Sequence, residues 1–279
     1  MTYCVRDVNQ KFWSSRCAPH VTVRLTQEST QRYKAHCHSE LSIGIIESGE
    51  TCLSMDGEDV VLGRGDAVLI LPERVHACNP VNGKPRTYYM LYIDRCWCCD
   101  VLSGFFHQKV THFQCDRSLR LPSETVLKLH RVISALMVSS SEALITEMND
   151  ILFSVLCSYC VPVRFFVNDM CLAYEVRKRL LDSFGPSVSI DEIAHDLGYS
   201  TETVIRHFKR HFGITPKSFL NNYRVEKAKS LIRNGMTIVD AALEVGYSDQ
   251  SQLHRAFVHY TAATPGQFQN IRSIFDNKQ

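Results

Sequence analysis

Three histidines and a glutamate in the first third of the chain have the types and spacing of a binding site. His36, His38 and Glu40 are two residues apart, and His76 follows later. In a β-strand, residues two apart face the same way, so an extended segment would place the first three side chains on one face. Imidazole and carboxylate groups are ligands for transition metals, and they also form polar walls for an organic effector. A third interpretation is that the histidines are buried and hydrogen-bonded in a core, and the spacing leaves all three open.

A cysteine cluster is the second candidate for chemistry. The chain has 12 cysteines, of which Cys96, Cys98 and Cys99 lie close together. They are candidates for a soft-metal or thiol-redox site that includes Cys157 and Cys160, although packing of these last two in a helix is the alternative. The N-terminal residues lack the apolar segment of an export signal, so a disulfide framework is not expected.

Basic side chains are concentrated in one stretch. The net charge of the whole chain is only +2. Residues 206 to 233, however, contain eight Lys and Arg residues and a single acid, Glu226. A basic band of this kind is typical of a surface that binds the phosphates of a nucleic acid.

The basic band lies within an internal repeat that spans residues 190 to 268. Five residues recur 48 positions later, and after a slip of one residue five more recur at an offset of 49. The first set is Ala194, Leu197, Gly198, Tyr199 and Ser200, matched by Ala242, Val245, Gly246, Tyr247 and Ser248. The second set is Arg206, Phe208, Thr215, Pro216 and Phe219, matched by Arg255, Phe257, Thr264, Pro265 and Phe268. A repeat of this period indicates a duplicated supersecondary unit.

Each copy has the signals of two short helices joined by a tight turn. Ser189 is a predicted N-cap, Gly198 a predicted helix end, and Ser200 a second N-cap. In the second copy Thr237 and Gly246 take the corresponding roles. Two short helices with a glycine-centred turn predict a helix-turn-helix, whose second helix enters the major groove of DNA.

The N-terminal half has the period of β-strands. Apolar residues alternate with polar ones over 21–25 and 41–45, and turn signals separate further short apolar runs. Many short strands at regular spacing predict a small antiparallel barrel or jelly roll. Residues 1–20 show little pattern. Residues 123–137 and 144–159 have the spacing of amphipathic helices, which either pack on the barrel or form a dimer contact.

Residues 174 to 269 resemble the DNA-binding domain of AraC/XylS-family bacterial transcription regulators, which has two helix-turn-helix units joined by one long helix. The segments that carry the resemblance are Leu197-Gly198-Tyr199-Ser200, residues 206–216, residues 223–228, residues 246–251, Arg255-Ala256-Phe257 and Thr264-Pro265. The resemblance implies recognition helices at about residues 201–211 and 249–259. It implies DNA contacts from Glu202, Ile205, Arg206, Lys209, Arg210, Gln250, Ser251, His254 and Arg255.

The N-terminal half resembles the cupin-like effector domain that often precedes such a DNA-binding domain. Residues 36–44, 72–76 and 89–94 carry this likeness. It implies an effector site formed by His36, His38, Glu40, His76 and Tyr89. Metal-dependent cupins use a similar imidazole and carboxylate set, so His36, His38 and His76, like Cys96, Cys98 and Cys99, are also candidates for a metal.

The predicted fold is α+β, with an antiparallel β-barrel and helical spacer before an all-α double helix-turn-helix domain. The predicted parts are an effector-binding domain (1–120), a spacer with dimerisation helices (121–165) and a DNA-binding domain (166–279). We expect a sequence-specific transcription regulator, an activator rather than a repressor, under the control of a small-molecule effector.

The alternatives are a metal-dependent cupin enzyme, and a regulator whose barrel senses a transition metal or redox state through its His and Cys residues. We expect no enzymatic activity and no required cofactor. Predicted partners are double-stranded DNA, a small-molecule effector, a second copy of the chain and, as the resemblance implies, RNA polymerase. No run approaches the roughly 20 apolar residues of a membrane helix, so no membrane association and a cytoplasmic location are expected.

Overall fold

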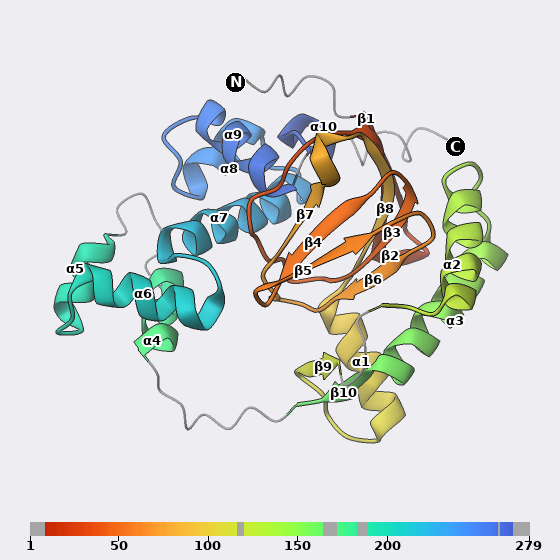
Figure 1. Cartoon of the computed structure of the whole chain (residues 1–279), viewed down its shortest axis with the longest axis horizontal. Coiled ribbons are helices and arrows are strands. Elements are labelled where there is room, and N and C mark those ends of the chain that lie inside the picture. Colours follow the sequence, from red (N-terminus) through yellow and green to blue (C-terminus); the bar gives the residue numbers. More distant parts are fainter. Residues whose placement is uncertain (1–8, 116–119, 164–171, 183–188, 262, 270–279) are drawn as a thin grey trace.

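The computed structural model describes residues 9–115, 120–163, 172–182, 189–261 and 263–269. Figure 1 shows an N-terminal β-sheet domain with helices on one side and a C-terminal helical domain on the other. The β-strands of the first domain are β1 (Asn9–Ser15), β2 (Ala18–Ser29), β3 (Leu41–Ser48), β4 (Thr51–Met55), β5 (Glu58–Leu62), β6 (Ala67–Ile70), β7 (His76–Pro80) and β8 (Arg86–Ile93). This arrangement confirms the predicted α+β class.

The elements after β8 are mainly helices. The next five are α1 (Arg95–Phe106), β9 (Phe113–Cys115), α2 (Ser123–Leu136), α3 (Glu142–Tyr159) and β10 (Cys160–Pro162). The helical domain contains α4 (Leu172–Asp182), α5 (Ile190–Asp196), α6 (Thr201–Phe212), α7 (Pro216–Arg233), α8 (Ile238–Glu244), α9 (Gln250–Thr261) and α10 (Pro265–Gln269). The predicted boundary at residue 165 lies outside the described residues. No helix in the described part of the chain is both long and apolar enough to cross a membrane.

The strands of the first domain form two antiparallel sheets that do not close into the predicted barrel. One sheet has the order β1-β2-β8-β3-β6 and the other β5-β4-β7, while β9 and β10 pair separately. A closed barrel requires every edge strand to pair with a neighbour. The edge strand β6 ends at Ile70, and Pro72 just beyond it has no N–H to donate to a ladder.

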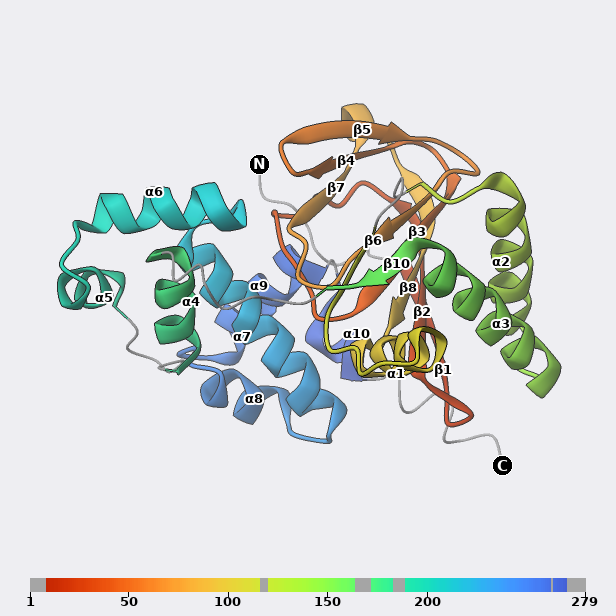
Figure 2. The ribbon, with the colours of Figure 1, turned by 90° about the horizontal axis from the view of Figure 1, so that it is seen from below.

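Alternation along the strands explains the two faces of the larger sheet. Val23 on β2, Ile43 on β3 and Leu91 on β8 point to the face covered by α2 and α3, where they join one large apolar core. Their neighbours Arg24, Gly44 and Met90 point to the other face, toward the smaller sheet. The helices predicted at 123–137 and 144–159 therefore pack on the sheet, as Figure 2 shows from below.

Two strands of the two larger sheets were not predicted from the sequence, and neither was the short pair β9 and β10. Residues 9–15 showed no pattern, yet they form β1, which pairs with β2 at the edge of the larger sheet. Trp13 on β1 is buried in the core, whereas most of its neighbours remain partly exposed, so the strand has a single apolar anchor. The second missed strand, β7, begins at His76 and pairs with β4.

The helical domain has the predicted duplicated form. Ser189 and Ser200 cap α5 and α6 by accepting hydrogen bonds from the backbone N–H three residues ahead, at 3.3 Å each. Gly198 has a positive φ of 74° and Gly246 one of 84°, the left-handed conformation that a turn between two helices requires.

The second copy differs at the start of its recognition helix. There Asp249 instead of Ser248 accepts from the N–H of Gln252, at 2.7 Å. This later cap is the physical origin of the one-residue slip in the repeat.

Helix α7 joins the two units and lies between separate apolar cores. Phe208 belongs to the core of the first unit and Phe257 to that of the second, and both are fully buried. In Figure 1 α7 extends from the first unit toward the open side of the β-sheets. The linker helix is thus placed where it meets the candidate site of the other domain.

Candidate functional site

The structure brings three of the predicted histidines together in a pocket between the two sheets and α7. His36, His38 and His76 are 8%, 6% and 3% exposed. The ring centroids of His36 and His76 are 4.5 Å apart, and those of His38 and His76 5.0 Å apart. His36 and His76 exchange two backbone hydrogen bonds, of 3.0 and 2.9 Å, so the chain itself holds the pair side by side.

Burial keeps these imidazoles neutral near pH 7. It lowers the pKa of His76 to about 4. Burial and the neighbouring His76 lower the pKa of His38 to about 3 and hold that of His36 well below its ordinary value. A neutral imidazole carries one N–H donor and one free lone pair, so each ring can both accept and donate in the pocket.

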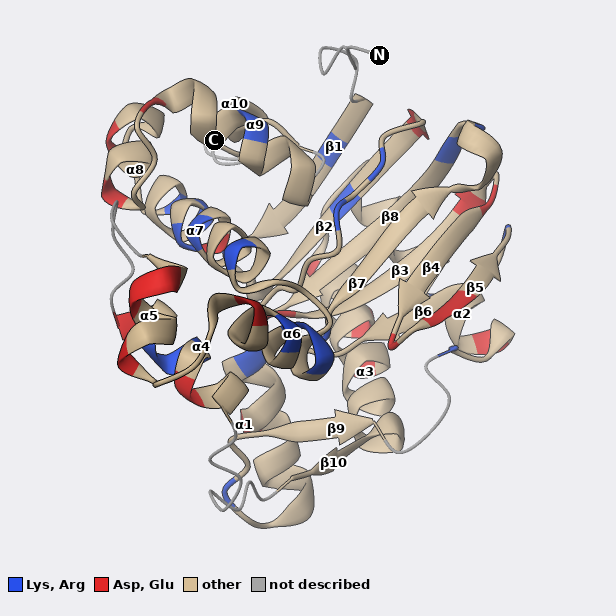
Figure 3. Ribbon diagram, turned by 60° about the vertical axis from the view of Figure 1, so that its left-hand side comes forward, with Lys and Arg blue, Asp and Glu red and all other residues tan. Residues whose placement is uncertain are grey.

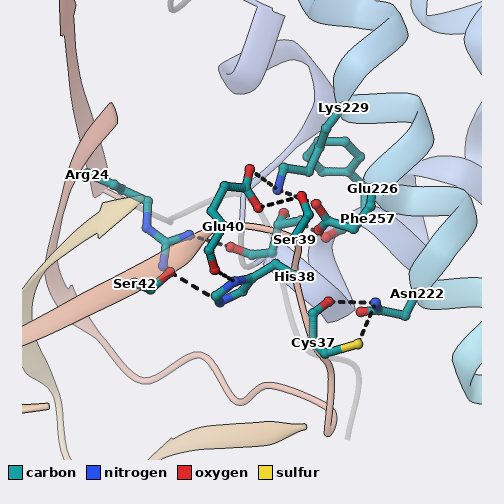
Figure 4. A network of polar contacts seen from close by, with 11 residues as sticks. Arg24, Cys37, His38, Ser39, Glu40, Ser42, Asn222, Glu226, Lys229 and Phe257 are labelled. Carbon is teal, nitrogen blue, oxygen red and sulfur yellow. Dashed lines mark hydrogen bonds and ion pairs between the residues drawn. The ribbon is translucent and has the colours of Figure 1, made fainter. Parts of the chain in front are cut away.

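Glu40 also lines the pocket, but its carboxylate turns to α7 (Figure 4). The segment 36–40 is not the regular strand that the spacing predicted, because only His36 forms a bridge and the chain bends at Ser39 and Glu40. The Nζ of Lys229 is 3.7 Å from Glu40 and 2.7 Å from Glu226. The candidate ligand set is therefore three histidines without a carboxylate.

The charges of this ion-pair group depend on one another. Burial alone would raise the pKa of Glu40, but the positive charge of Lys229, together with His38, a backbone hydrogen bond and Arg233, outweighs burial and lowers that pKa to about 2. Burial would lower the pKa of Lys229, and the charges of Glu226 and Glu40 raise it instead. Burial raises the pKa of Glu226. The lysine thus lowers the pKa of both carboxylates, and for Glu226 burial still has the larger effect.

Two buried arginines line the same pocket. Arg24 and Arg86 are 4% and 1% exposed. Arg24 donates to the hydroxyl of Tyr33 (3.2 Å) and to the backbone carbonyl of Thr261 (2.6 Å), and Arg86 donates to the carbonyl of Cys78 (2.8 Å). Among the described residues neither guanidinium pairs with a carboxylate, and the Nε of both has no hydrogen-bond partner. A buried cation without a counter-charge is costly, so these groups favour an anion in the pocket.

Aromatic side chains surround the two guanidinium groups. The guanidinium carbon of Arg24 is 5.4 Å from the ring centre of Tyr92, and that of Arg86 is 5.1 Å from the ring centre of Tyr88. The structure places the predicted Tyr89 away from this pocket, beside His130, because successive residues of β8 point to opposite faces. The phenols that β8 contributes to the pocket are those of Tyr88 and Tyr92.

The cysteine cluster is not assembled into a site. Cys96 is exposed at the start of α1, whereas Cys98 is fully buried and its pKa is raised by burial and by Cys160. Within the described ranges, the only group of three or more metal-ligating side chains close enough to share an ion is His36, His38 and His76. The described cysteines are all free thiols.

The linker helix α7 forms one wall of the pocket. Four of its residues at spacings of four, three and four lie on one face toward the β domain. They are Asn222, Glu226, Lys229 and Arg233. The side-chain N–H of Asn222 donates to the backbone carbonyl of Cys37, at 2.6 Å. The cavity measures about 70 Å³, room for a few waters, an ion or a small organic molecule.

The predicted DNA-contacting residues lie on the surface of α6 and α9. On α6, Glu202, Arg206, Lys209 and Arg210 are exposed, and Ile205 is half-buried. Figure 3 shows Lys and Arg along α6 and α7, whereas acidic residues mark α5. On α9, the exposed residues are Gln250, Ser251 and Arg255, and His254 is half-buried. Both helices thus present side chains that can hydrogen-bond to bases or phosphates.

The end of α9 is tied to the β domain. The backbone carbonyl of Thr261 accepts the hydrogen bond from Arg24, and that of His259 accepts one from the backbone N–H of Lys34, at 3.2 Å. An arginine that lines the pocket therefore also contacts the C-terminal end of the second recognition helix. The roles of Arg24, Asn222 and Lys229 were missed in the sequence. For Asn222 and Lys229, the available signal in the sequence was the row of polar residues at helical spacing between the two repeats.

Two family models match the chain. A helix-turn-helix domain matches residues 193–271, and an AraC-like ligand binding domain matches residues 19–148. The second range contains the three histidines and both buried arginines. The first begins within α5 and includes both recognition helices.

Curated relatives are named as transcriptional regulators. The chain is 25% identical over 233 residues to YbfI, an uncharacterised HTH-type transcriptional regulator of Bacillus subtilis, which covers 80% of this chain and 82% of the relative. It is also 32% identical over 115 residues to an uncharacterised HTH-type regulator of Staphylococcus aureus, covering 40% of this chain and only 15% of that protein.

Solved structures of ToxT from Vibrio cholerae share the fold. An apo variant superimposes with a TM-score of 0.56 at 10% identity and covers 90% of this chain and 97% of that one. ToxT with an unsaturated fatty acid bound gives a TM-score of 0.53 at 14% identity and covers 95% and 97%. The likeness extends over both the β domain and the helical domain of this chain.

Proposed function

This chain belongs to the AraC family of helix-turn-helix transcriptional regulators, and from this membership we propose that a small anionic effector in the histidine pocket controls how α6 and α9 read promoter DNA. A DNA-binding regulator with an effector-binding domain is the function of the family. The proposal adds two points: the chemical nature of the effector, and the element through which effector binding changes the DNA-binding helices.

The observation that carries the proposal is the double role of α7. This helix joins the two helix-turn-helix units, and its polar face is also a wall of the pocket through Glu226 and Lys229, while Asn222 on the same face bonds to the carbonyl of Cys37. A ligand that changes the position of segment 36–40 changes contacts with α7 directly. Effector binding and the relative placement of α6 and α9 are thereby coupled through one element.

The buried guanidiniums of Arg24 and Arg86 support an anionic effector. A carboxylate between them would supply the missing counter-charge and accept hydrogen bonds from the unpartnered Nε atoms. ToxT has been solved with an unsaturated fatty acid and with a naphthalenyl-butenoic acid, both carboxylic acids. The small cavity favours a shorter acid in this chain.

DNA reading is assigned to the exposed faces of the two recognition helices. Arg206 and Arg255 occupy matching positions of the repeat, and each can bond a guanine through two hydrogen bonds. Lys209 and Arg210 supply sequence-independent affinity for phosphates. Two linked recognition helices of this kind would bind an asymmetric DNA site longer than one turn of the double helix.

The further partners belong to the same proposal. We assign residues 1–120 to effector binding, 121–165 to a spacer and dimer contact, and 166–279 to DNA binding. Exposed apolar side chains support the dimer contact, since Leu127 on α2 is 71% and Phe153 on α3 is 47% exposed. The protein would act in the cytoplasm as an activator that contacts RNA polymerase, without an enzymatic reaction.

The test is DNA binding by the full chain with and without carboxylic acids. Fluorescence anisotropy at fixed salt would compare DNA from upstream of its own gene with a shuffled duplex, and a thermal-shift screen of short carboxylic acids would identify candidates. We expect sequence preference, and an acid that shifts both the melting temperature and the DNA affinity. Equal affinity for both duplexes would contradict the regulator. A shift that survives in Arg24→Gln and Arg86→Gln would contradict the anion site.

A further inference from the structure

The three clustered histidines have their ring nitrogens divided between two roles. The Nδ1 of each ring lies within hydrogen-bond distance of a backbone carbonyl two residues away. These contacts are His36 to Lys34 (2.8 Å), His38 to Glu40 (3.0 Å) and His76 to Arg74 (2.9 Å). A carbonyl oxygen only accepts, so Nδ1 carries the proton in all three rings, and each Nε2 keeps its lone pair.

The three free lone pairs gather in one small volume. One ligand nitrogen from each of the three histidines lies within 4.8 Å of the other two. Zinc binds imidazole nitrogen at about 2.0–2.1 Å, which in a tetrahedral site places ligands roughly 3.3 Å apart. The ligand nitrogens therefore need to approach one another by about 1.5 Å at most, a movement within reach of side-chain rotation.

Few groups compete for the Nε2 atoms. Among the described residues, His36 and His76 have no hydrogen-bond partner at Nε2. The hydroxyl of Ser42 is 3.4 Å from the Nε2 of His38, at the long end of hydrogen-bond distances. The metal-ligating histidines of proteins commonly donate their second ring nitrogen to a backbone carbonyl or carboxylate, which fixes the ring and the tautomer. All three rings meet that condition here.

The backbone holds the three rings in register. His36 and His76 are linked by their reciprocal backbone bonds, and the carbonyl of His38 accepts from the N–H of Glu73, at 2.8 Å. Two short segments, 36–38 and 73–76, are thus tied together at both ends. A site built on such a frame loses little conformational freedom when it binds.

Charges near the cluster are mixed. Arg24 is positive and acts on His36, whereas the negative Glu40 and the positive Lys229 both act on His38. A bound dication would add positive charge to the pocket, which an anionic effector would offset. Metal and anion would then bind more tightly together than either alone.

We propose that His36, His38 and His76 bind one divalent first-row transition ion through their Nε2 atoms. Neutral imidazoles suit Zn²⁺, Ni²⁺, Fe²⁺ and Cu²⁺, and the site contains no carboxylate or thiolate ligand. Three protein ligands leave a coordination position open, as in zinc sites that bind a further ligand. This inference rests on the proposed function, because the open coordination position of the ion would receive the anionic effector.

Binding would act on the linker helix through the chain between the ligands. Cys37 lies between two of the histidines, and its carbonyl accepts the hydrogen bond from Asn222. Closing His36 and His38 on an ion would move that carbonyl. The metal is thereby placed to change the position of α7.

The experiment is Zn²⁺ titration of the chelator-treated full chain by calorimetry, together with Co²⁺ absorption spectra. We expect about one equivalent to bind and Co²⁺ spectra with d–d bands but no thiolate charge-transfer band. His36→Gln and His76→Gln should each weaken Zn²⁺ binding at least tenfold. His195→Gln, which changes a fully exposed histidine on α5, is the matched control and should bind like the parent chain.

Three results would overturn the metal site: no binding to the parent chain, unchanged affinity in both variants, or a thiolate band. Far-UV circular dichroism checks that the variants fold. If one does not, the other variant and the Co²⁺ spectrum of the parent chain still decide. DNA binding is measured in parallel, so a parent chain that binds no Zn²⁺ but still binds its promoter sequence rejects the metal site and leaves the regulator standing.

Discussion

The side-chain amide of Asn222 donates a hydrogen bond of 2.6 Å to the backbone carbonyl of Cys37, across the boundary between the helical and the β domain. Asn222 is only 4% exposed, and the two residues are 185 positions apart. The histidines on either side of Cys37 belong to the pocket. The contact therefore joins the histidine pocket to the helix between the two helix-turn-helix units.

Asn222→Ala should weaken this connection. The substitution leaves the Cys37 carbonyl without its donor, and the free energy of unfolding should fall by about 1–3 kcal/mol. The change in DNA affinity that the effector causes should shrink as well. Urea denaturation and anisotropy titrations measure the two effects. Asn221→Ala, one residue away, is the control, and an effector response equally reduced there would argue against a specific role for Asn222.

Arg255→Ala should relax sequence discrimination. If Arg255 bonds a guanine, its loss should cost about 1–3 kcal/mol of discrimination against the wrong base. Lys209→Ala should instead weaken binding to every sequence alike, because a phosphate contact carries no sequence information. Titrations of promoter and single-base variants at fixed salt separate the two. Unchanged discrimination in Arg255→Ala would reject base reading by this residue.

Lys229→Met should destabilise the interface between the domains. The lysine is only 12% exposed and lies between Glu40 and Glu226, so its removal leaves two nearby carboxylates without their ion-pair partner. We expect a loss of roughly 3 kcal/mol in unfolding free energy. The double variant Lys229→Met, Glu226→Gln should recover part of the loss because it removes one negative charge. Equal stability of the single and double variants would show that the carboxylates do not interact.

The two matching tyrosines of the repeat should respond differently to substitution. Tyr199 is 50% exposed, whereas Tyr247 is 7% exposed, and its hydroxyl donates to the backbone carbonyl of Asn221, at 3.4 Å. Tyr247→Ala should therefore cost about 3 kcal/mol of stability, and Tyr199→Ala only about 0.5 kcal/mol or less. Thermal or urea unfolding provides the comparison. Similar losses would mean that α7 does not cover the second unit as described.

Local signals predicted most of the helical domain. Capping residues such as Ser189 and Ser200, and the positive φ of Gly198, are properties of a few neighbouring residues, so the sequence reveals them directly. The core positions Phe208 and Phe257 follow from helical spacing in the same way. The strand β1 was not predicted because it is held by one buried side chain, Trp13, and by pairing with β2.

Long-range placement limited what the sequence could predict about the site. The alternation of His36 and His38 was visible, but the turn of Glu40 toward Lys229 depends on a helix almost 190 residues away. The prediction of Tyr89 was one position away from a residue that lines the pocket. Adjacent residues of a strand point to opposite faces of the sheet, so Tyr89 lies on the other side. The unpaired charge of Arg24 appears only when the neighbouring strands and α9 surround it.

Arg24 lines the pocket and also contacts the last turn of α9, so this geometry links ligand binding to DNA binding, and thermodynamic linkage acts in both directions. If the pocket ligand changes the affinity for DNA by some factor, DNA must change the affinity for the ligand by the same factor. The promoter is then an effector of the pocket. A protein already bound at its operator would respond to a different concentration of the small molecule than one that is free, so each promoter sets the threshold at which it is switched.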